Sequence, residues 1–155
     1  MKIRKATKKD FKEISKIMMN ESSKRPYNGK DTLRTALKEI IEYSKKDLYV
    51  AVNEKEIIGF MASNIIQGSK KAYIKELWLK PIYQGKGVGK TLVKFIENKY
   101  KKRGINIIRL VTKRNAGAFK FYKKLKYIEH KTLVFMEKKL KWKNYTYQET
   151  MLVLS

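Results

Sequence analysis

The sequence YIKELWLKPIYQGKGVGKTLVKFIENKYKKRGINIIRLVT occupies residues 73–112 and combines two apolar strands with a glycine turn and a helix. The pattern predicts a strand at 73–79 that Pro81 ends, and a helix from the turn to about residue 102. Residues 106–112 are apolar and branched enough to form a buried strand. The order strand, helix, strand implies a right-handed parallel crossover, so this pair of strands is expected at the centre of the fold.

Apolar spacing in the expected helices predicts which faces are buried. In the helix after the glycine turn, the residues in line are Val88, Leu92, Ile96 and Tyr100. A helix at about 11–20 would bury Phe11, Ile14, Ile17 and Met18. A helix that begins at Asp31 or Thr32 would bury Leu33, Leu37, Ile40, Ile41 and Ser44. A fourth helix, capped by Asn115, would bury Ala118, Phe121, Tyr122 and Leu125.

The remaining segments predict short strands and loops. The expected strands are one at 2–6, a hairpin at 48–66 with its turn at 53–55, and two more near 127–137 and 147–154. The stretch ESSKRPYNG at 21–29 is rich in turn-forming residues and is expected to be a loop. The predicted fold is therefore a mixed α/β (α+β) architecture, with a mostly antiparallel sheet, one parallel pair of strands and about four helices.

Length and composition favour one globular domain over residues 1–155, because 43% apolar residues can fill a single core. The chain has no cysteine, which excludes disulfides and thiolate sites, and its one histidine, His130, has no second imidazole to share a metal. No metal site is expected. The start MKIRKATKKD lacks the apolar run of a signal peptide, and no later run approaches the roughly 18 residues of a membrane span. We therefore expect a soluble cytoplasmic protein.

The formal net charge of +24 would attract phosphate-bearing ligands, nucleic acid or anionic surfaces. Most of the basic residues are lysines spread along every segment, which is more typical of a solvated surface than of a recognition stripe. Nucleic-acid binding is therefore possible but not favoured.

The glycine turn, QGKGVG at residues 84–89, is suited to binding phosphate. Its glycines let a ligand approach the backbone, and the amides and partial positive charge of the helix N-terminus would face that ligand. By itself the turn could equally be a tight connection under a strand. The P-loop pattern requires a first glycine where Gln84 stands, and the dinucleotide pattern requires one at Lys90 or Leu92, so both of these motifs fail.

The turn and a second block together resemble the cofactor motifs of the GCN5-related N-acetyltransferase (GNAT) superfamily. The first motif is Gln or Arg, two residues, Gly, one residue, then Gly or Ala, and Gln84, Gly87 and Gly89 match it. The second block is matched in order by Asn115, Ala118, Tyr122, Lys124 and Leu125. Lys126 departs from the glycine that is usual before the aromatic residue, here Tyr127. The order of elements also agrees, so the resemblance covers nearly the whole chain.

The resemblance implies that acetyl-CoA lies in a slot between residues 73–79 and 106–112. In similar proteins the strand before the glycine turn carries a β-bulge and splays from its parallel neighbour. The cofactor-binding residues that it implies are Leu77, Trp78, Leu79, Gln84, Gly85, Lys86, Gly87, Val88, Gly89, Lys90, Asn115, Tyr122 and Lys124. The side chains of Leu77 and Leu79 would also pack in the core, and Asn115 could serve only as a helix cap.

The chemistry implied by the resemblance is direct transfer of an acetyl group to a primary amine. Because an amine of pKa about 10.4 is mostly protonated near neutral pH, a proton acceptor is needed. Glu76 matches the acidic residue of many relatives, although a surface ion pair with a lysine is an equal alternative. Tyr122 matches the family's proton donor to the thiolate, the alternative being an aromatic core residue.

The acceptor is the least determined feature of the chain. In similar proteins the acceptor site is bordered by the loop between the first two helices and by the last strands, here residues 21–29 and about 134–147. Their basic and aromatic residues favour an acceptor that is neutral or acidic apart from its amine. Two other functions stay open: a nucleic-acid- or ribosome-associated protein, and a non-catalytic acyl-CoA sensor. A monomer or a homodimer is compatible with the sequence.

Overall fold

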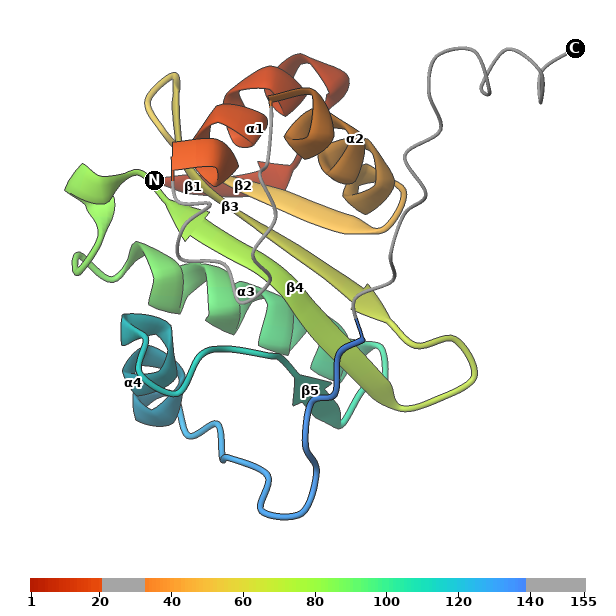
Figure 1. Cartoon of the computed structure of the whole chain (residues 1–155). Coiled ribbons are helices and arrows are strands. Elements are labelled where there is room, and N and C mark those ends of the chain that lie inside the picture. Colours follow the sequence, from red (N-terminus) through yellow and green to blue (C-terminus); the bar gives the residue numbers. More distant parts are fainter. Residues whose placement is uncertain (21–32, 139–155) are drawn as a thin grey trace, which may run out of the picture.

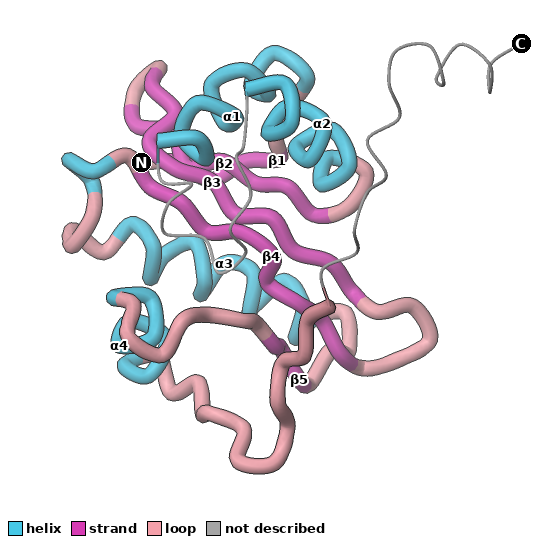
Figure 2. Tube along the Cα trace, viewed as in Figure 1, coloured by secondary structure: helices cyan, strands magenta, loops and turns pink. Residues whose placement is uncertain are grey.

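The computed structural model describes residues 1–20 and 33–138, and its described part is built on one mixed sheet. The strands are β1 (Lys2–Lys5), β2 (Asp47–Asn53), β3 (Glu56–Ile65), β4 (Lys71–Leu79) and β5 (Ile107–Arg109). They lie in the order β1-β2-β3-β4-β5, and every neighbouring pair is antiparallel except β4 and β5 (Figure 2). The predicted mostly antiparallel sheet with one parallel pair is confirmed.

Helices cover both faces of the sheet (Figure 1). On one face lie α1 (Phe11–Asn20), which the short 3₁₀ turn η1 (Lys8–Asp10) precedes, and α2 (Leu33–Ser44). On the other face lie α3 (Val88–Lys102) and α4 (Gly117–Lys124). Two separate apolar cores result, one under α1 and α2 and one under α3 and α4. In the part of the chain that the structure describes, no helix is long and apolar enough to cross a membrane.

The helix α3 is packed as its sequence predicts. Val88, Leu92, Ile96 and Tyr100 are all buried against the sheet, and Gly104, with φ of 76°, follows the end of the helix. The Tyr100 hydroxyl lies 2.7 Å from Ser63 Oγ and donates to Asp47 Oδ2 at 2.9 Å. These hydrogen bonds give the buried Tyr100 hydroxyl two partners and join the C-terminal end of α3 to β2 and β3.

The strand predicted at 106–112 is shorter than expected. Only Ile107 to Arg109 form β5, and Ile107 is 41% exposed rather than buried. The strand predicted at 127–137 is absent: the described residues 127–138 contain no strand, and the side chains of Ile128 and Met136 are 88% and 85% exposed. An apolar segment forms a strand only where it pairs with the edge of a sheet. Sequence periodicity does not show whether such an edge is available.

The predicted face of α2 is partly wrong. The helix buries Ala36 and Ile40, whereas Leu33 and Ile41 are 44% and 41% exposed. The apolar residues of α2 extend around more than a third of its circumference, so spacing alone did not identify the side that meets β2 and β3. The proposed caps Asp31 and Thr32 lie outside the described residues, as do the loop at 21–29 and the strand at 147–154.

The start of α4 also differs from the prediction. The residue at its N-cap is Ala116, without a side-chain hydrogen bond, and Asn115 is exposed one residue earlier. Ala118 is exposed as well, whereas Tyr122 is buried and Phe121 is partly buried. The helix therefore begins two residues after Asn115, which places that side chain too early to reach the free amides of the first turn.

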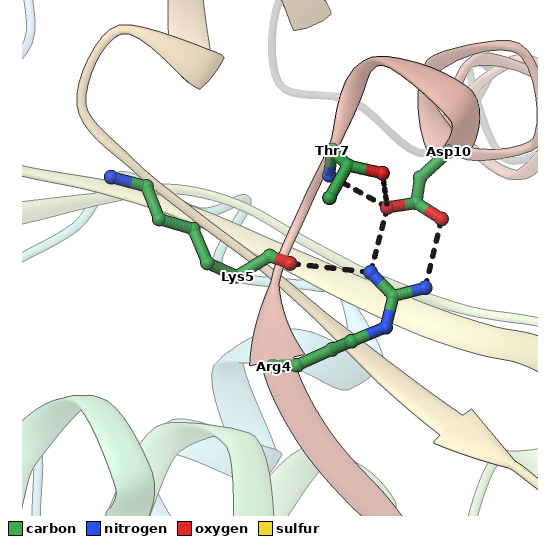
Figure 3. Close-up of polar contacts among 4 residues, drawn as sticks. All are labelled: Arg4, Lys5, Thr7 and Asp10. Carbon is green, nitrogen blue, oxygen red and sulfur yellow. Dashed lines mark hydrogen bonds and ion pairs between the residues drawn. The ribbon is translucent and has the colours of Figure 1, made fainter.

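A charged network closes the N-terminal end of the sheet (Figure 3). Arg4 donates to both carboxylate oxygens of Asp10, at 2.7 and 2.9 Å, and the Thr7 amide and hydroxyl donate to Asp10 Oδ2 at 2.7 and 2.9 Å. The guanidinium of Arg4, together with the donors of Thr7, outweighs burial and lowers the pKa of Asp10 from 3.8 to about 2. The network ties β1 to η1, the turn that directly precedes α1.

The substitution Asp10→Asn should lower the free energy of unfolding at pH 7 by about 1–2 kcal/mol, a value reduced by the partial exposure of Arg4. Because folding lowers this pKa, the stabilisation is complete above the ordinary pKa and is lost as the pH falls towards 2. Urea titrations of both proteins from pH 7 down to pH 3 should therefore show a difference in unfolding free energy that is constant above about pH 4 and becomes smaller below it. A difference in unfolding free energy that did not depend on pH would contradict the role of the ionised Asp10 carboxylate. Glu42→Gln, at an exposed ion pair, is the control.

Candidate active site

The strand β4 contains a β-bulge that decides where its side chains point. Ala62 pairs with Glu76 and Ser63 pairs with Ile74, so Lys75 is an extra residue without a partner on β3. Before the bulge, Ile74 faces the core under α3; after it, Leu77 faces this core. The extra residue thereby turns Glu76 and Trp78 towards α1 and α2, where Trp78 packs.

The two parallel strands separate directly after they meet. Lys71 to Tyr73 pair with β5, and beyond Tyr73 the edge of β4 has no strand beside it in the described part of the chain. A cavity of about 1580 Å³ lies along this open edge. It is lined by Leu77 and Leu79 from one face of β4 and by Glu76 and Trp78 from the other, so it connects the two sides of the sheet. The bulge and the splay implied by the family resemblance are both present.

The glycine turn forms one end of this cavity. Gly85, Gly87, Gly89 and Lys90 line it, and Gly87 is the N-cap of α3 in the left-handed conformation, with φ of 84°. A β-carbon at Gly87 would have nothing within 4 Å, so the space in front of the turn is open. The first amides of α3 have no partner within the helix and carry its positive dipole end. An anion fits this arrangement.

Side-chain contacts hold the turn in place. Gln84 Nε2 donates to the Leu79 carbonyl oxygen at 3.2 Å and ties the turn to the end of β4. Lys80 contacts Glu13 and Glu56 at 2.8 and 3.0 Å, and the Tyr83 hydroxyl donates to Glu56 at 2.8 Å. The 3₁₀ segment η3 (Pro81–Tyr83) is therefore anchored to α1 and β3 before the glycines begin.

Positive charge is concentrated along the cavity. Six lysines line it, namely Lys75, Lys90, Lys94, Lys113, Lys124 and Lys126. They come from β4, α3, the segment after β5, and α4, so they surround the cavity instead of lying on one helix face. A ligand with several phosphate groups matches this distribution.

Glu76 lies midway along β4 and is held by two donors. Its residue is only 8% exposed, Trp78 Nε1 donates to Oε2 at 2.6 Å, and the Tyr43 hydroxyl donates to Oε1 at 3.2 Å. The residue is buried and faces the cavity instead of the open surface. A carboxylate fixed in this way has the position and chemistry of a proton acceptor.

Tyr122 on α4 lines the same cavity and is 7% exposed. Its ring makes edge contacts with Phe121 and Tyr127, at centroid distances of 5.0 and 5.3 Å, so it is also a core residue. Burial, reinforced by the negative charge of Glu76, raises the pKa of Tyr122 above the ordinary value of 10. Its hydroxyl therefore keeps its proton at neutral pH.

Most of the predicted site residues lie together around this cavity. Those that line it are Glu76, Leu77, Trp78, Leu79, Gln84, Gly85, Gly87, Gly89, Lys90, Tyr122 and Lys124. Lys86, Val88 and Asn115 are not among its lining residues. Val88 is buried under α3, the Lys86 ammonium lies 5.9 Å from the centre of the Tyr83 ring, and Asn115 is exposed. His130 accepts hydrogen bonds from the amides of Thr132 and Leu133 in an exposed segment.

Sequence reasoning missed other residues of the cavity, among them Tyr43, Lys94 and Lys113. Lys94 follows Lys90 by one helical turn, so helical spacing placed both on one face and could have identified it. Tyr43 gave no such signal. It belongs to α2, and only tertiary packing brings its hydroxyl to Glu76, 33 positions further along the chain.

The comparison with protein families agrees with this geometry. The model of the acetyltransferase (GNAT) family matches residues 13–127, and the chain belongs to this family. The match includes the bulged strand, the glycine turn and α4.

Individual relatives are consistent with this membership. An uncharacterized N-acetyltransferase of Methanocaldococcus jannaschii is 28% identical over 82% of this chain and 60% of its own length. Spermidine N(1)-acetyltransferase of Thermoplasma acidophilum is 41% identical over 48% of this chain and 45% of its own. The chain thus spans about half the length of the curated relatives it matches. The crystal structure of the PaiA N-acetyltransferase of Thermoplasma acidophilum in complex with coenzyme A matches 80% of this chain and 87% of its own, at 27% identity and a TM-score of 0.65.

The left-handed conformation of Gly87 predicts a specific stability change. Gly87→Ala should lower the free energy of unfolding by about 1–2 kcal/mol, because an L-residue at this φ is strained although no atom obstructs its β-carbon. Gly117→Ala is the matched control. Gly117 is also at the start of a helix and has open space, but it lacks a positive φ, so alanine should be neutral or stabilising there. If Gly87→Ala and Gly117→Ala lowered the free energy of unfolding equally in urea denaturation, backbone strain at position 87 would be contradicted.

Proposed function

We propose that the protein is an acetyl-CoA-dependent N-acetyltransferase that acetylates a primary amine. The observation that carries the proposal is a single cavity with an anion-binding helix N-terminus at one end and the Glu76–Tyr122 pair in its middle. Family membership supports the same activity. Residues 1–155 would form one catalytic domain, and we propose a cytoplasmic location for it.

The residues of the cavity fit acetyl-CoA. The turn at Gly85 and Gly87 leaves open space, and the amides of α3 with Lys90 would hold the pyrophosphate. Lys124 and Lys126 are available for the remaining phosphate. The exposed edge of β4 offers backbone groups of Leu77 and Leu79 to the pantetheine amides. When bound, acetyl-CoA supplies the acetyl group as an activated thioester.

Two residues of this chain would transfer the protons of the reaction. Glu76 would accept a proton from the attacking amine, directly or through water, and Tyr122 Oη would donate one to the thiolate that leaves. The two residues reach the cavity from different faces of the sheet, which places the acceptor side near α2 and the cofactor side near α3 and α4. Placing the two reactants together would contribute much of the rate.

The cofactor part of this proposal can be tested without an acceptor. Titration calorimetry should give saturable one-to-one binding of acetyl-CoA, and Gly87→Glu should weaken it by about 100-fold or more, because a side chain and a negative charge enter the phosphate end of the cavity. Gly68→Glu is the matched control, with the same charge change at another glycine of positive φ, in the turn between β3 and β4. Binding no tighter than that of dephospho-CoA and of an unrelated polyanion would contradict the proposal.

The catalytic part predicts a loss of turnover without a loss of binding. Glu76→Gln keeps the shape of the side chain and removes its basicity, so kcat should fall roughly 10²- to 10⁴-fold while the Kd for acetyl-CoA stays unchanged. CoA release should be measured with an amine panel of spermidine, a peptide with a free N-terminus and sisomicin. Tight binding without turnover of any amine by the unaltered protein would favour a sensor over an enzyme.

A further inference from the structure

Because Glu76 is buried, the proposed reaction needs a route by which the proton on this residue returns to solvent. A base that accepts a proton in each turnover must return it to solvent before the next one. Glu76 is 8% exposed, and its Oε2 is occupied by the short hydrogen bond from Trp78 Nε1. The proton must therefore leave through Oε1 or through the acceptor side of the cavity.

A second carboxylate lies on the other side of Tyr43. The Tyr43 hydroxyl oxygen is 3.2 Å from Glu76 Oε1 and 3.5 Å from Glu39 Oε2. Both distances exceed those of a full O–H···O hydrogen bond, as expected when one hydroxyl hydrogen is shared between two acceptors. The hydroxyl can therefore donate to either carboxylate.

Helical spacing holds this arrangement in place. Glu39 and Tyr43 are four residues apart on α2, so one turn of helix stacks their side chains. Glu39 is half-buried and is not among the residues that line the cavity, whereas Glu76 is buried and lines it. The hydroxyl of Tyr43, which itself lines the cavity, is therefore placed between an inner and an outer carboxylate.

We infer that Tyr43 relays the proton from Glu76 to Glu39, and this inference rests on the proposed function. After the amine has given its proton to Glu76 Oε1, that O–H bond breaks as the proton moves to Tyr43 Oη. The original hydroxyl proton of Tyr43 moves at the same time to Glu39 Oε2. Water then takes the proton from Glu39, and Tyr43 turns its new hydrogen back to Glu76. One proton has passed from the amine to solvent, and all three side chains have returned to their starting forms.

Among the residues that the structure describes, the other titratable groups around Glu76 do not offer the same path. Tyr43 and Glu39 face it from α2, Tyr122 approaches it from α4, and Lys75 lines the cavity beside it on β4. Tyr122 holds its proton at neutral pH and is required as a donor elsewhere in the reaction. Lys75 is a cation and accepts no proton until it has lost one. The Tyr43 hydroxyl lies between two carboxylates from different elements, Glu39 on α2 and Glu76 on β4.

A relay and a purely structural role give different responses to buffer. Tyr43→Phe and Glu39→Gln should each lower kcat about tenfold in dilute buffer, with the KM for acetyl-CoA unchanged. A high concentration of imidazole should restore most of the loss, because a small buffer molecule can carry the proton that the relay no longer carries. Glu42→Gln is the matched control, since it makes the same change on an exposed part of α2.

The probes are acetyl-CoA with spermidine and, separately, with a peptide bearing a free N-terminal amine. Calorimetric Kd values for acetyl-CoA and melting temperatures should match between the variants and the unaltered protein, which excludes a general loss of structure. An unchanged kcat at low imidazole, or a loss that imidazole does not restore, would overturn the relay and leave the acetyltransferase proposal intact. If the unaltered protein acetylated neither probe, the proposed function would fail. The relay, which rests on that function, would then fail as well.

Discussion

The extra residue in β4 is the constraint on which the site depends. A regular strand would carry Ile74, Glu76 and Trp78 on one face, buried in the apolar core under α3, where a carboxylate is costly. Because Lys75 interrupts the pairing with β3, Glu76 and Trp78 turn to the opposite face. There the carboxylate receives hydrogen bonds from Trp78 and Tyr43 instead of apolar neighbours. The same irregularity accompanies the separation of β4 from β5, which opens the cavity.

Charge is divided along this cavity in a way that the net charge conceals. Six lysines line the cavity, with Lys75 next to Glu76 on β4, and the carboxylates of Glu39 and Glu76 lie on the side of α2. A chain with a formal charge of +24 thus keeps local negative charge where an amine would have to arrive. The preference for an acceptor without extra positive charge was inferred from segments 21–29 and 134–147, most of which lie outside the described residues, and it stays a prediction.

Much of the fold could be predicted because it follows from local chemistry. The face of α3 is one stripe of four apolar residues, and the turn before it needs glycine for its left-handed N-cap. Where the prediction failed, local pattern was ambiguous. The apolar residues of α2 surround too much of the helix to single out Ala36 and Ile40, and the apolar residues at 127–137 form no strand in the structure. Asn115 has the right side chain for a cap, but α4 begins at Gly117, too late to use it.

The sequence by itself determined the parallel crossover, the glycine turn at the start of α3 and the family resemblance, because each follows from residue spacing within one or two short segments. Only the tertiary structure decided the surroundings of Glu76. Its burial requires the bulge at Lys75, its donors come from positions 43 and 78, and its second carboxylate comes from position 39. Such a cluster depends on how α2 packs against α1 and the sheet, and that packing reflects the summed contacts of the whole core, which no short pattern of residues encodes.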